Sequence, residues 1–145
     1  MAVMYPNADV PILQLSLKRG LDPQDHLAAG HALAALRNEG LLIIGSGSSY
    51  HNLRMLGPEA KEPSAEFDDW LQHTLEATDF EKRAIALAAW EAAPSARVAH
   101  PREEHLLPLM AALGAAEKDA ATRFYHEDTF FGSGSVSSFV FAKSH

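Results

Sequence analysis

The feature that most constrains the fold is an uninterrupted apolar run, Leu41-Leu42-Ile43-Ile44, which directly follows a segment with helical periodicity. A short, continuously apolar run is typical of a strand that is covered on both faces. Residues 10–17 are rich in branched aliphatic side chains, alternate at Leu13, Leu15 and Leu17, and predict a strand upstream of that helix. Strand, helix and strand in this order predict a right-handed crossover and a parallel strand pair. We therefore expect an α/β fold with a mixed, largely parallel sheet flanked by helices.

Helix-end signals indicate where the covering helices lie. Asp22-Pro23 fits a helix start, with an acidic cap and a proline in the first turn, and Asn38-Glu39-Gly40 fits the end of the same helix. Helical periodicity returns from residue 63 to about 92, and a shorter helix is predicted from about 102 to 113, stopped by Gly114. The apolar residues of the longer segment favour a place in the core over the wall of a substrate pocket.

The C-terminal part of the chain predicts a β-hairpin. Residues 123–125 and 136–141 are rich in aromatic and β-branched side chains, and the Gly/Ser turn at 132–134 joins them. The chain has 145 residues, of which 47% are hydrophobic, and this is enough for a single core. We find no internal repeat and no linker.

Charge and cysteine content exclude several classes of function. The net charge of −7 disfavours nonspecific binding to nucleic acid or to an anionic membrane. The absence of cysteine excludes a disulfide framework, a thiol nucleophile and a cysteine-liganded zinc site. No apolar stretch approaches the roughly 18 residues that a membrane span needs, and the first residues do not resemble a secretory signal, so a cytoplasmic protein is expected.

The loop after the second predicted strand is the first candidate site, because such loops line the ligand crevice of open α/β sheets. Its glycines, within residues 45–49, could cradle a phosphate, but the loop lacks the full dinucleotide and P-loop patterns. The alternative is a tight turn that positions the residue after it. That residue, His51, is either a functional side chain or a hydrogen-bonded structural one.

The segment His100-Pro-Arg-Glu-Glu-His105 is the densest cluster of potential metal ligands. Its two histidines are five residues apart, whereas a helical two-histidine zinc clamp needs a spacing of four, so at most one of them is a ligand. His105 is favoured, because it lies where the segment turns from polar to apolar. Glu103 and Glu104 are more simply first-turn acids of a helix. The other histidines have no companion spacing and are expected on the surface or in the core: His26, His31, His73, His126 and His145.

Two strings in the sequence resemble a known family. Residues 42–54, LIIGSGSSYHNLR, and residues 100–109, HPREEHLLPL, resemble the two downstream motifs of class III extradiol ring-cleavage dioxygenases of the 4,5-DOPA dioxygenase type. Residues 4–11, 14–17 and 134–138 agree with the same family. The resemblance covers residues 1–145 as a partial, C-terminal section of the catalytic domain. The family's upstream half, with its Gly-His-Gly-Ser-Pro and Ser-Ala-His-Trp motifs, does not occur in this sequence.

The resemblance implies a metal-dependent enzyme that opens an aromatic ring. His105 matches a metal ligand, and His51 matches an acid/base histidine beside the metal whose role overlaps with ligation. Fe(II) is the implied cofactor, because extradiol cleavage needs open positions for a catechol and O₂, and Zn²⁺ also suits imidazole ligands. Asn52 would orient the ring of His51 through a hydrogen bond. The implied partners are a small aromatic diol and O₂, with no nucleic acid and no membrane.

The family's upstream metal ligands are histidines that this chain lacks, and three interpretations follow. The chain is a fragment of a longer enzyme, which we favour, a subunit that pairs with a separate partner, or a relic that no longer binds iron. A relic would be a non-catalytic metal- or partner-binding remnant of the same fold. In each case the half-domain surface is expected to be covered, by the upstream half or by a homo-oligomer. A phosphate or nucleotide site at residues 45–49 remains a third, weaker function.

Overall fold

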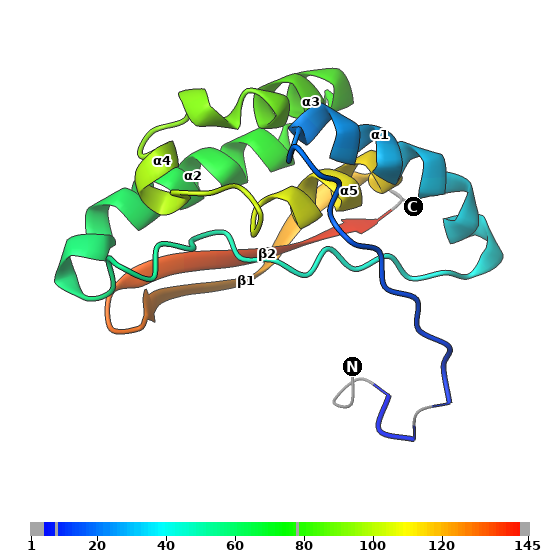
Figure 1. Cartoon of the computed structure of the whole chain (residues 1–145), viewed down its shortest axis with the longest axis horizontal. Helices are drawn as coiled ribbons and strands as arrows, with labels where there is room; N and C mark the ends of the chain where they lie inside the picture. The colour runs from blue at the N-terminus through cyan, green and yellow to red at the C-terminus, as the bar shows by residue number, and fades with distance from the viewer. Residues whose placement is uncertain (1–4, 8, 78, 143–145) are drawn as a thin grey trace.

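The computed structural model describes residues 5–7, 9–77 and 79–142 and places the helices on one side of a β-hairpin (Figure 1). Three short 3₁₀ turns, Ala34–Glu39, Pro58–Ala60 and Trp90–Ala92, connect the longer elements. The fold is therefore mixed α and β, as expected. The other elements are α1 (Pro23–Leu33), α2 (Lys61–Glu76), α3 (Phe80–Ala88), α4 (Ala96–Ala99), α5 (Leu107–Ala116), β1 (Ala120–Phe130) and β2 (Gly134–Ala142).

The predicted hairpin is confirmed and is longer than the sequence pattern indicated. Strands β1 and β2 pair antiparallel, from Ala120 opposite Ala142 to Phe130 opposite Gly134, with two irregularities in the register. Helix α2 packs against both strands, so the hairpin has one face covered by helices.

The predicted parallel sheet is not confirmed. In the described part of the chain, the sheet has two antiparallel strands, and residues 10–17 and 41–44 run extended without joining it. No described backbone group accepts a hydrogen bond from the N–H groups of residues 42–47. On either side of this stretch, Leu41 N–H donates to Leu36 O and Ser48 N–H donates to His105 O. Apolar periodicity predicts which faces are to be buried, but a strand forms only where a neighbour supplies the other half of its hydrogen bonds.

The helix predictions are correct in kind and partly wrong in extent. Helix α1 begins as predicted, with the Asp22 side chain accepting from Gln24 N–H at 2.8 Å, and its 3₁₀ extension ends at Gly40. The long helical segment is split between α2 and α3. Helix α5 begins at Leu107 instead of residue 102, because the preceding segment forms tight turns and Pro108 takes the first turn of the helix.

Gly114 does not stop α5 as predicted but lies inside it, against α1. A Cβ atom at this position would stand 2.1 Å from Leu27 O and 2.9 Å from His31 N. The two helices can approach this closely because Gly114 has no side chain. The glycine therefore marks a helix contact and not a helix end.

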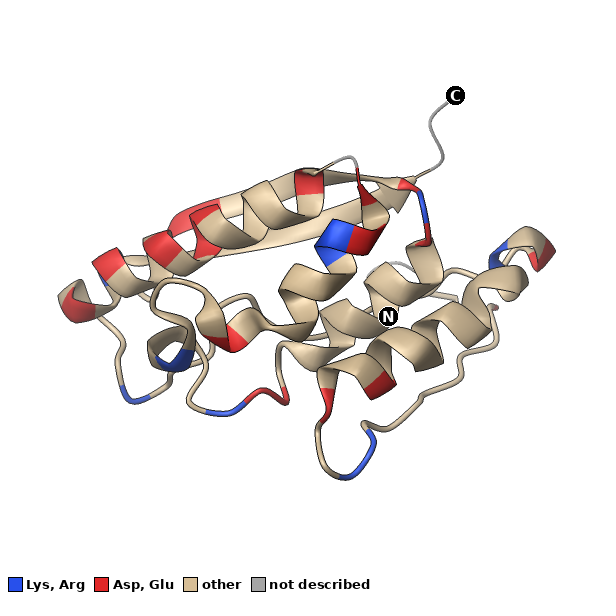
Figure 2. Cartoon of the chain, turned by 90° about the horizontal axis from the view of Figure 1, so that it is seen from above, with Lys and Arg blue, Asp and Glu red and all other residues tan. Residues whose placement is uncertain are grey.

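The core lies between the hairpin and the helices and includes most of the large apolar residues of the 63–92 segment, whereas Ile85 in the same segment is exposed. Figure 2 shows acidic residues along α2, which agrees with the net negative charge. No helix in the described residues combines the length and the apolar character needed to traverse a membrane. Large side chains with almost no exposed surface include Phe67, Leu71, Leu75, Leu87, Trp90, Leu106, Leu107, Met110 and Leu113.

Candidate functional site

His51 and His105 meet face to face although 54 positions separate them. Their ring centroids lie 3.4 Å apart, with an interplanar angle of 22°, and both residues are half-buried. No other described residue hydrogen-bonds to a ring nitrogen of either side chain, so each ring keeps a nitrogen available to a ligand or a substrate. The structure therefore brings together the two residues that the sequence motifs singled out.

Backbone hydrogen bonds hold the His51 segment against the segment before α5. His51 N–H donates to Ala99 O at 3.0 Å, and Ser48 N–H donates to His105 O at 2.9 Å. Asn52 does not bond to the ring of His51, contrary to expectation, because its side-chain amide donates to Val98 O at 2.8 Å. Asn52 thus fixes the backbone that carries His51 and leaves the ring free.

Gly47 allows the two segments to come this close. A Cβ atom on Gly47 would lie 2.1 Å from His105 O, a backbone atom that cannot move aside easily. A carbonyl oxygen repels an anion, and the next helical turn after the loop begins only at Pro58. No helix N-terminus therefore directly follows the loop at residues 45–49, and a positioning role is favoured over a phosphate cradle.

His100 belongs to the core and holds the loop that leads to His51. It is fully buried, and its ring lies edge-on to the rings of Phe67 and Trp90, with centroids 5.1 and 5.9 Å away. Its Nε2 donates to Ser49 O at 3.0 Å, since a carbonyl oxygen can only accept. No sequence pattern predicted this role, because the contacts of His100 with Phe67 and Trp90 are tertiary contacts.

The electrostatic surroundings favour a neutral His51. Partial burial lowers the pKa of His51 and the neighbouring His105 lowers it further, whereas Glu104 and a hydrogen bond to the backbone of His51 itself oppose both effects. A neutral imidazole is the form that binds a metal or accepts a proton. Glu103 and Glu104 form ion pairs with arginines, at 2.8 Å from Arg97 and 2.9 Å from Arg102.

The histidine pair fits part of a metal site. Imidazole nitrogens are suitable donors for Fe(II) or Zn²⁺. No cluster of three or more His, Cys, Asp or Glu that could hold a metal occurs among residues 5–7, 9–77 and 79–142. The described chain therefore offers two nitrogen ligands, and a site with three protein ligands needs a further donor.

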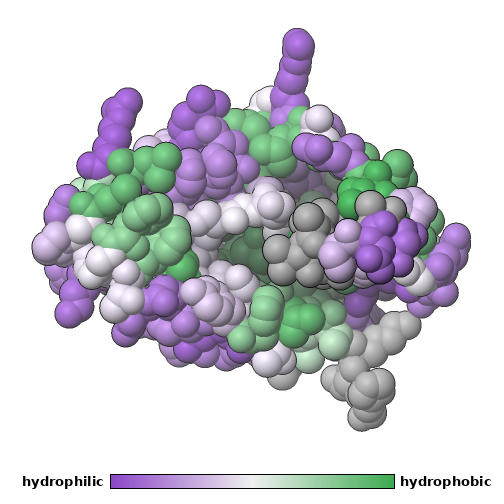
Figure 3. Space-filling model, turned by 90° about the horizontal axis from the view of Figure 1, so that it is seen from below, coloured by the Kyte–Doolittle hydropathy of each residue, from purple (hydrophilic) through white to green (hydrophobic). Residues whose placement is uncertain are grey.

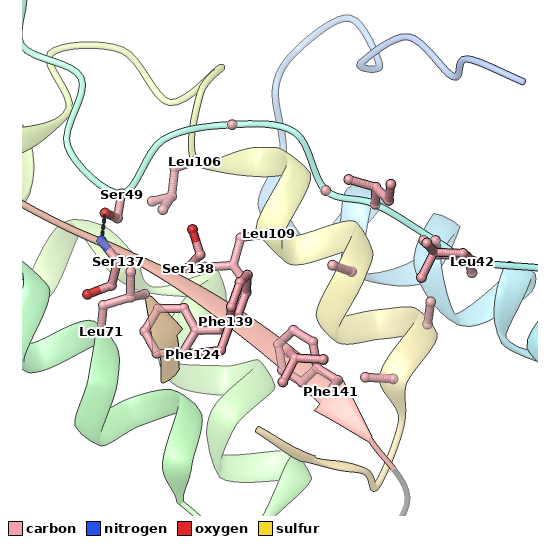
Figure 4. Close-up of a pocket in the computed structure, with 18 of the residues that line it drawn as sticks. Leu42, Ser49, Leu71, Leu106, Leu109, Phe124, Ser137, Ser138, Phe139 and Phe141 are labelled. Carbon is pink, nitrogen blue, oxygen red and sulfur yellow. Dashed lines mark hydrogen bonds between the residues drawn. The ribbon is translucent and has the colours of Figure 1, made fainter. Parts of the chain in front are cut away.

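An open groove of about 810 Å³ reaches His105. We call it the β2 groove; residues 41–49 form one wall, α5 the second and β2 with Phe124 of β1 the third. Figure 3 shows the hollow from below, with hydrophobic residues inside it. Ser137 N–H donates to Ser49 Oγ at 2.8 Å at one end, and the walls diverge from there toward Leu42 and Phe141 (Figure 4).

We expect His100 to make the protein sensitive to acid. Burial lowers the pKa of His100 from 6.5 to about 4. Between these two pH values His100 is therefore protonated in the unfolded chain but neutral in the folded chain. The contribution of His100 to stability is complete above pH 6.5 and should fall by about 3 kcal/mol as the pH approaches 4. Urea unfolding of the native chain and of His100→Gln at several pH values measures this loss. The variant should be less stable at pH 7 and should lack this part of the pH dependence; parallel curves would contradict the assignment.

Comparisons with known proteins agree on one family. A sequence profile described as the catalytic LigB subunit of aromatic ring-opening dioxygenase matches residues 1–141. The chain is 38% identical over 146 residues to "4,5-DOPA dioxygenase extradiol" of Beta vulgaris, covering 98% of this chain and 53% of that protein. It is 35% identical over 141 residues to "Dioxygenase tasH" of Hapsidospora irregularis, covering 88% and 43% of the two chains.

A solved structure shares the fold. The crystal structure of the uncharacterized protein JW3007 from Escherichia coli K12 superposes with a TM-score of 0.82 at 29% identity. The match covers 95% of this chain and 58% of that one. The chain spans about half the length of the curated relatives it matches.

Proposed function

Because this chain belongs to the family of the catalytic LigB subunit of aromatic ring-opening dioxygenases, we propose that it forms the C-terminal part of an extradiol catechol dioxygenase. The observation that carries the proposal is the contact between His51 and His105, whose rings stack at 3.4 Å beside the β2 groove. The two histidines are carried by segments that are joined by backbone hydrogen bonds, so the pair is positioned before any ligand binds.

In this proposal His105 is a metal ligand, with Fe(II) as the cofactor and Zn²⁺ as the alternative. Bound Fe(II) would supply open coordination positions at which a catechol and O₂ are brought together. His105 is suited to hold it because its ring nitrogens have no other partner in the described chain. The remaining protein ligands would come from the upstream half, whose motifs contribute histidines in the family that the sequence resembles.

His51 is proposed as the acid/base residue. A catechol must lose a proton from a hydroxyl group before its ring is attacked, and a neutral imidazole nitrogen can accept that proton. The lowered pKa of His51 favours the neutral side chain at neutral pH, and no other described residue bonds to its ring nitrogens, which supports this exchange. Asn52 and Gly47 act as positioning residues, since they hold the loop that carries His51.

The proposed substrates are a small aromatic diol and O₂. Three of the curated relatives carry the name 4,5-DOPA dioxygenase extradiol and are 38% identical to this chain, which favours a catechol over other aromatic compounds. The reaction consumes one O₂ per catechol, breaks the ring bond next to the diol and leaves both oxygen atoms in the open product.

The competing function is a non-catalytic metal- or partner-binding remnant of the fold. It is favoured by one observation, namely that the described residues provide only two nitrogen donors in one place. The two functions differ in what happens when further ligands are supplied.

The test is to join this chain to the upstream half of the Beta vulgaris relative and to load the product with Fe(II) without oxygen. We expect the joined protein to bind iron and to take up one O₂ per catechol, with formation of the ring-opened product followed by its absorbance. This chain alone should take up no O₂. The relative's own full-length protein is the positive control, and the joined protein without catechol is the blank. Iron binding without O₂ uptake would support the remnant. A joined protein that neither binds iron nor takes up O₂ would contradict both metal-dependent functions.

A further inference from the structure

A buried carboxylate lies where α2 meets the hairpin, and the proposed chemistry does not use it. It belongs to Asp68 of α2 and contacts Arg123 and His126 of β1. We propose that Asp68 is a positioning residue for the histidine pair and that it acts through Ser137 and Ser49. The inference rests on the proposed function only for what the pair does, because the positioning itself is a property of the described chain.

Three groups of the hairpin surround one oxygen of Asp68. The side chain of Asp68 is only 2% exposed, and its Oδ2 accepts from Ser137 Oγ at 2.9 Å. The same oxygen lies 3.3 Å from a guanidinium nitrogen of Arg123 and 3.2 Å from Nδ1 of His126. The other oxygen, Oδ1, is buried without a hydrogen-bond partner among the described residues, so the charge is stabilised at Oδ2. A buried charge is costly when it loses a partner, and Asp68 therefore holds both strands against α2.

The cluster also fixes the side chain of Ser137. Its hydroxyl donates to Asp68, because a carboxylate paired with an arginine can only accept. Ser137 Oγ lies 3.1 Å from Nδ1 of His126, and this nitrogen must carry a hydrogen because both of its neighbours accept. The sequence placed His126 on the surface or in the core without a companion. In the structure its ring is 38% exposed and is a partner of a buried carboxylate.

Ser137 connects this cluster to the loop that carries His51. Its backbone N–H donates to Ser49 Oγ at 2.8 Å (Figure 4). The carbonyl oxygen of Ser49 accepts from Nε2 of His100 at 3.0 Å. Ser49 is therefore held by β2 at its side chain and by the core at its backbone, two residues before His51.

The bond between Ser137 and Ser49 restrains His51 in a direction that the other bonds leave open. The N–H of His51 donates to Ala99 O, at the end of α4, and the side chain of Asn52 donates to the same helix. The bond to Ser49 ties the loop to the hairpin instead. Two anchors on different elements restrict the loop to one position, and a ring contact at 3.4 Å requires such a restraint.

The alternative is that the cluster only stabilises the fold. An ion pair between Asp68 and Arg123 would be enough to hold α2 against β1. The hydroxyl of Ser137 is not needed for that ion pair, whereas it is needed for the connection from Asp68 to Ser49. The two roles therefore differ in whether loss of this hydroxyl moves the histidine rings while the ion pair remains.

The test measures the ring contact by NMR of this chain with isotope-labelled histidine and without iron. The readouts are the nuclear Overhauser effect (NOE) between the ring protons of His51 and His105 and the chemical shifts of both rings. Ser137→Ala removes the hydroxyl and leaves Asp68 paired with Arg123. The NOE falls with the sixth power of the distance, so a displacement of about 0.5 Å should weaken it about twofold. Ser137→Thr keeps a hydroxyl, suits a strand and should restore the NOE.

Two further variants separate positioning from stability. Asp68→Asn removes the charge that holds the hairpin and should weaken the NOE as Ser137→Ala does. Asp119→Asn is the matched control, because Asp119 also pairs with an arginine, Arg37, that is 24% exposed like Arg123. It should lower the melting temperature and leave the NOE unchanged.

A parent-like NOE in Ser137→Ala would overturn the proposal, and so would an equal loss in Asp119→Asn or in Ser137→Thr. Absence of the NOE in the parent chain would overturn it as well. If Asp68→Asn does not fold, Ser137→Ala still decides, because it leaves the ion pair intact. None of these measurements requires iron or turnover. A correctly positioned pair in a joined protein that cleaves no catechol would therefore contradict the proposed function and leave the role of Asp68 intact.

Discussion

His51→Gln is expected to lower the rate of ring cleavage by about 10²–10⁴-fold while the iron content of the joined protein stays close to that of the parent. Glutamine retains polar atoms near the position of the imidazole but cannot take up the catechol proton at neutral pH. His51 and His105 stack at 3.4 Å, so the same experiment on both residues separates proton transfer from metal binding. Initial O₂ uptake and iron per protein are the two measurements.

His105→Ala should give the opposite pattern. Loss of a ligand should lower the iron content first, and activity should partly return when excess Fe(II) is supplied. His31→Gln on α1 is the matched control, because this histidine is exposed and should change neither quantity. If His51→Gln loses iron as His105→Ala does, His51 is a ligand and not the acid/base residue. A rate within threefold of the parent would remove His51 from the mechanism.

The parts of the fold that could be predicted depend on short-range chemistry. The Asp22 cap, the helix end at Gly40 and the turn between β1 and β2 each use residues within a few positions of one another. Such signals act in the same way whatever the rest of the chain does. The class of the fold and the hairpin followed from them.

The predicted parallel sheet is not confirmed, because the aliphatic pattern of a segment does not specify which strand lies beside it. Residues 10–17 and 41–44 carry the aliphatic pattern of strands, yet a strand also needs a neighbour within hydrogen-bonding reach. The aliphatic pattern alone therefore does not determine whether such a segment is paired, because pairing depends on which other strands lie beside it.

The two histidines of the candidate site could be predicted from the sequence, but the tertiary contacts that hold them could not. The resemblance of two motifs singled out His51 and His105, and the five-residue spacing predicted that His100 and His105 do not both bind a metal. The sequence could not show that His100 is buried against Phe67 and Trp90, since this contact joins distant segments. It also could not show that Gly47 touches His105 O, because a close backbone approach is a tertiary contact.

Gly114→Ala is expected to destabilise the protein by about 3 kcal/mol, the upper end for overpacking, and to lower its melting temperature by about 10 °C. In an isolated helix this change would stabilise by about 0.5–1 kcal/mol, because glycine loses more backbone entropy than alanine. Here the new Cβ would lie 2.1 Å from Leu27 O, and α1 and α5 would have to separate. Since α5 begins two residues after His105, this separation would also disturb the histidine pair.

The sign of the effect distinguishes packing from helix propensity. Ala29→Gly on the exposed side of α1 is the matched control, and propensity alone should make it about 1 kcal/mol less stable. Urea unfolding at pH 7 measures both variants under the same conditions. If helix contact dominates, Gly114→Ala is the less stable of the two although it adds the better helix former. If Gly114→Ala is instead as stable as the native chain or more so, α1 and α5 do not approach as closely as the structure shows, and Gly114 acts as the helix end that its place in the sequence first indicated.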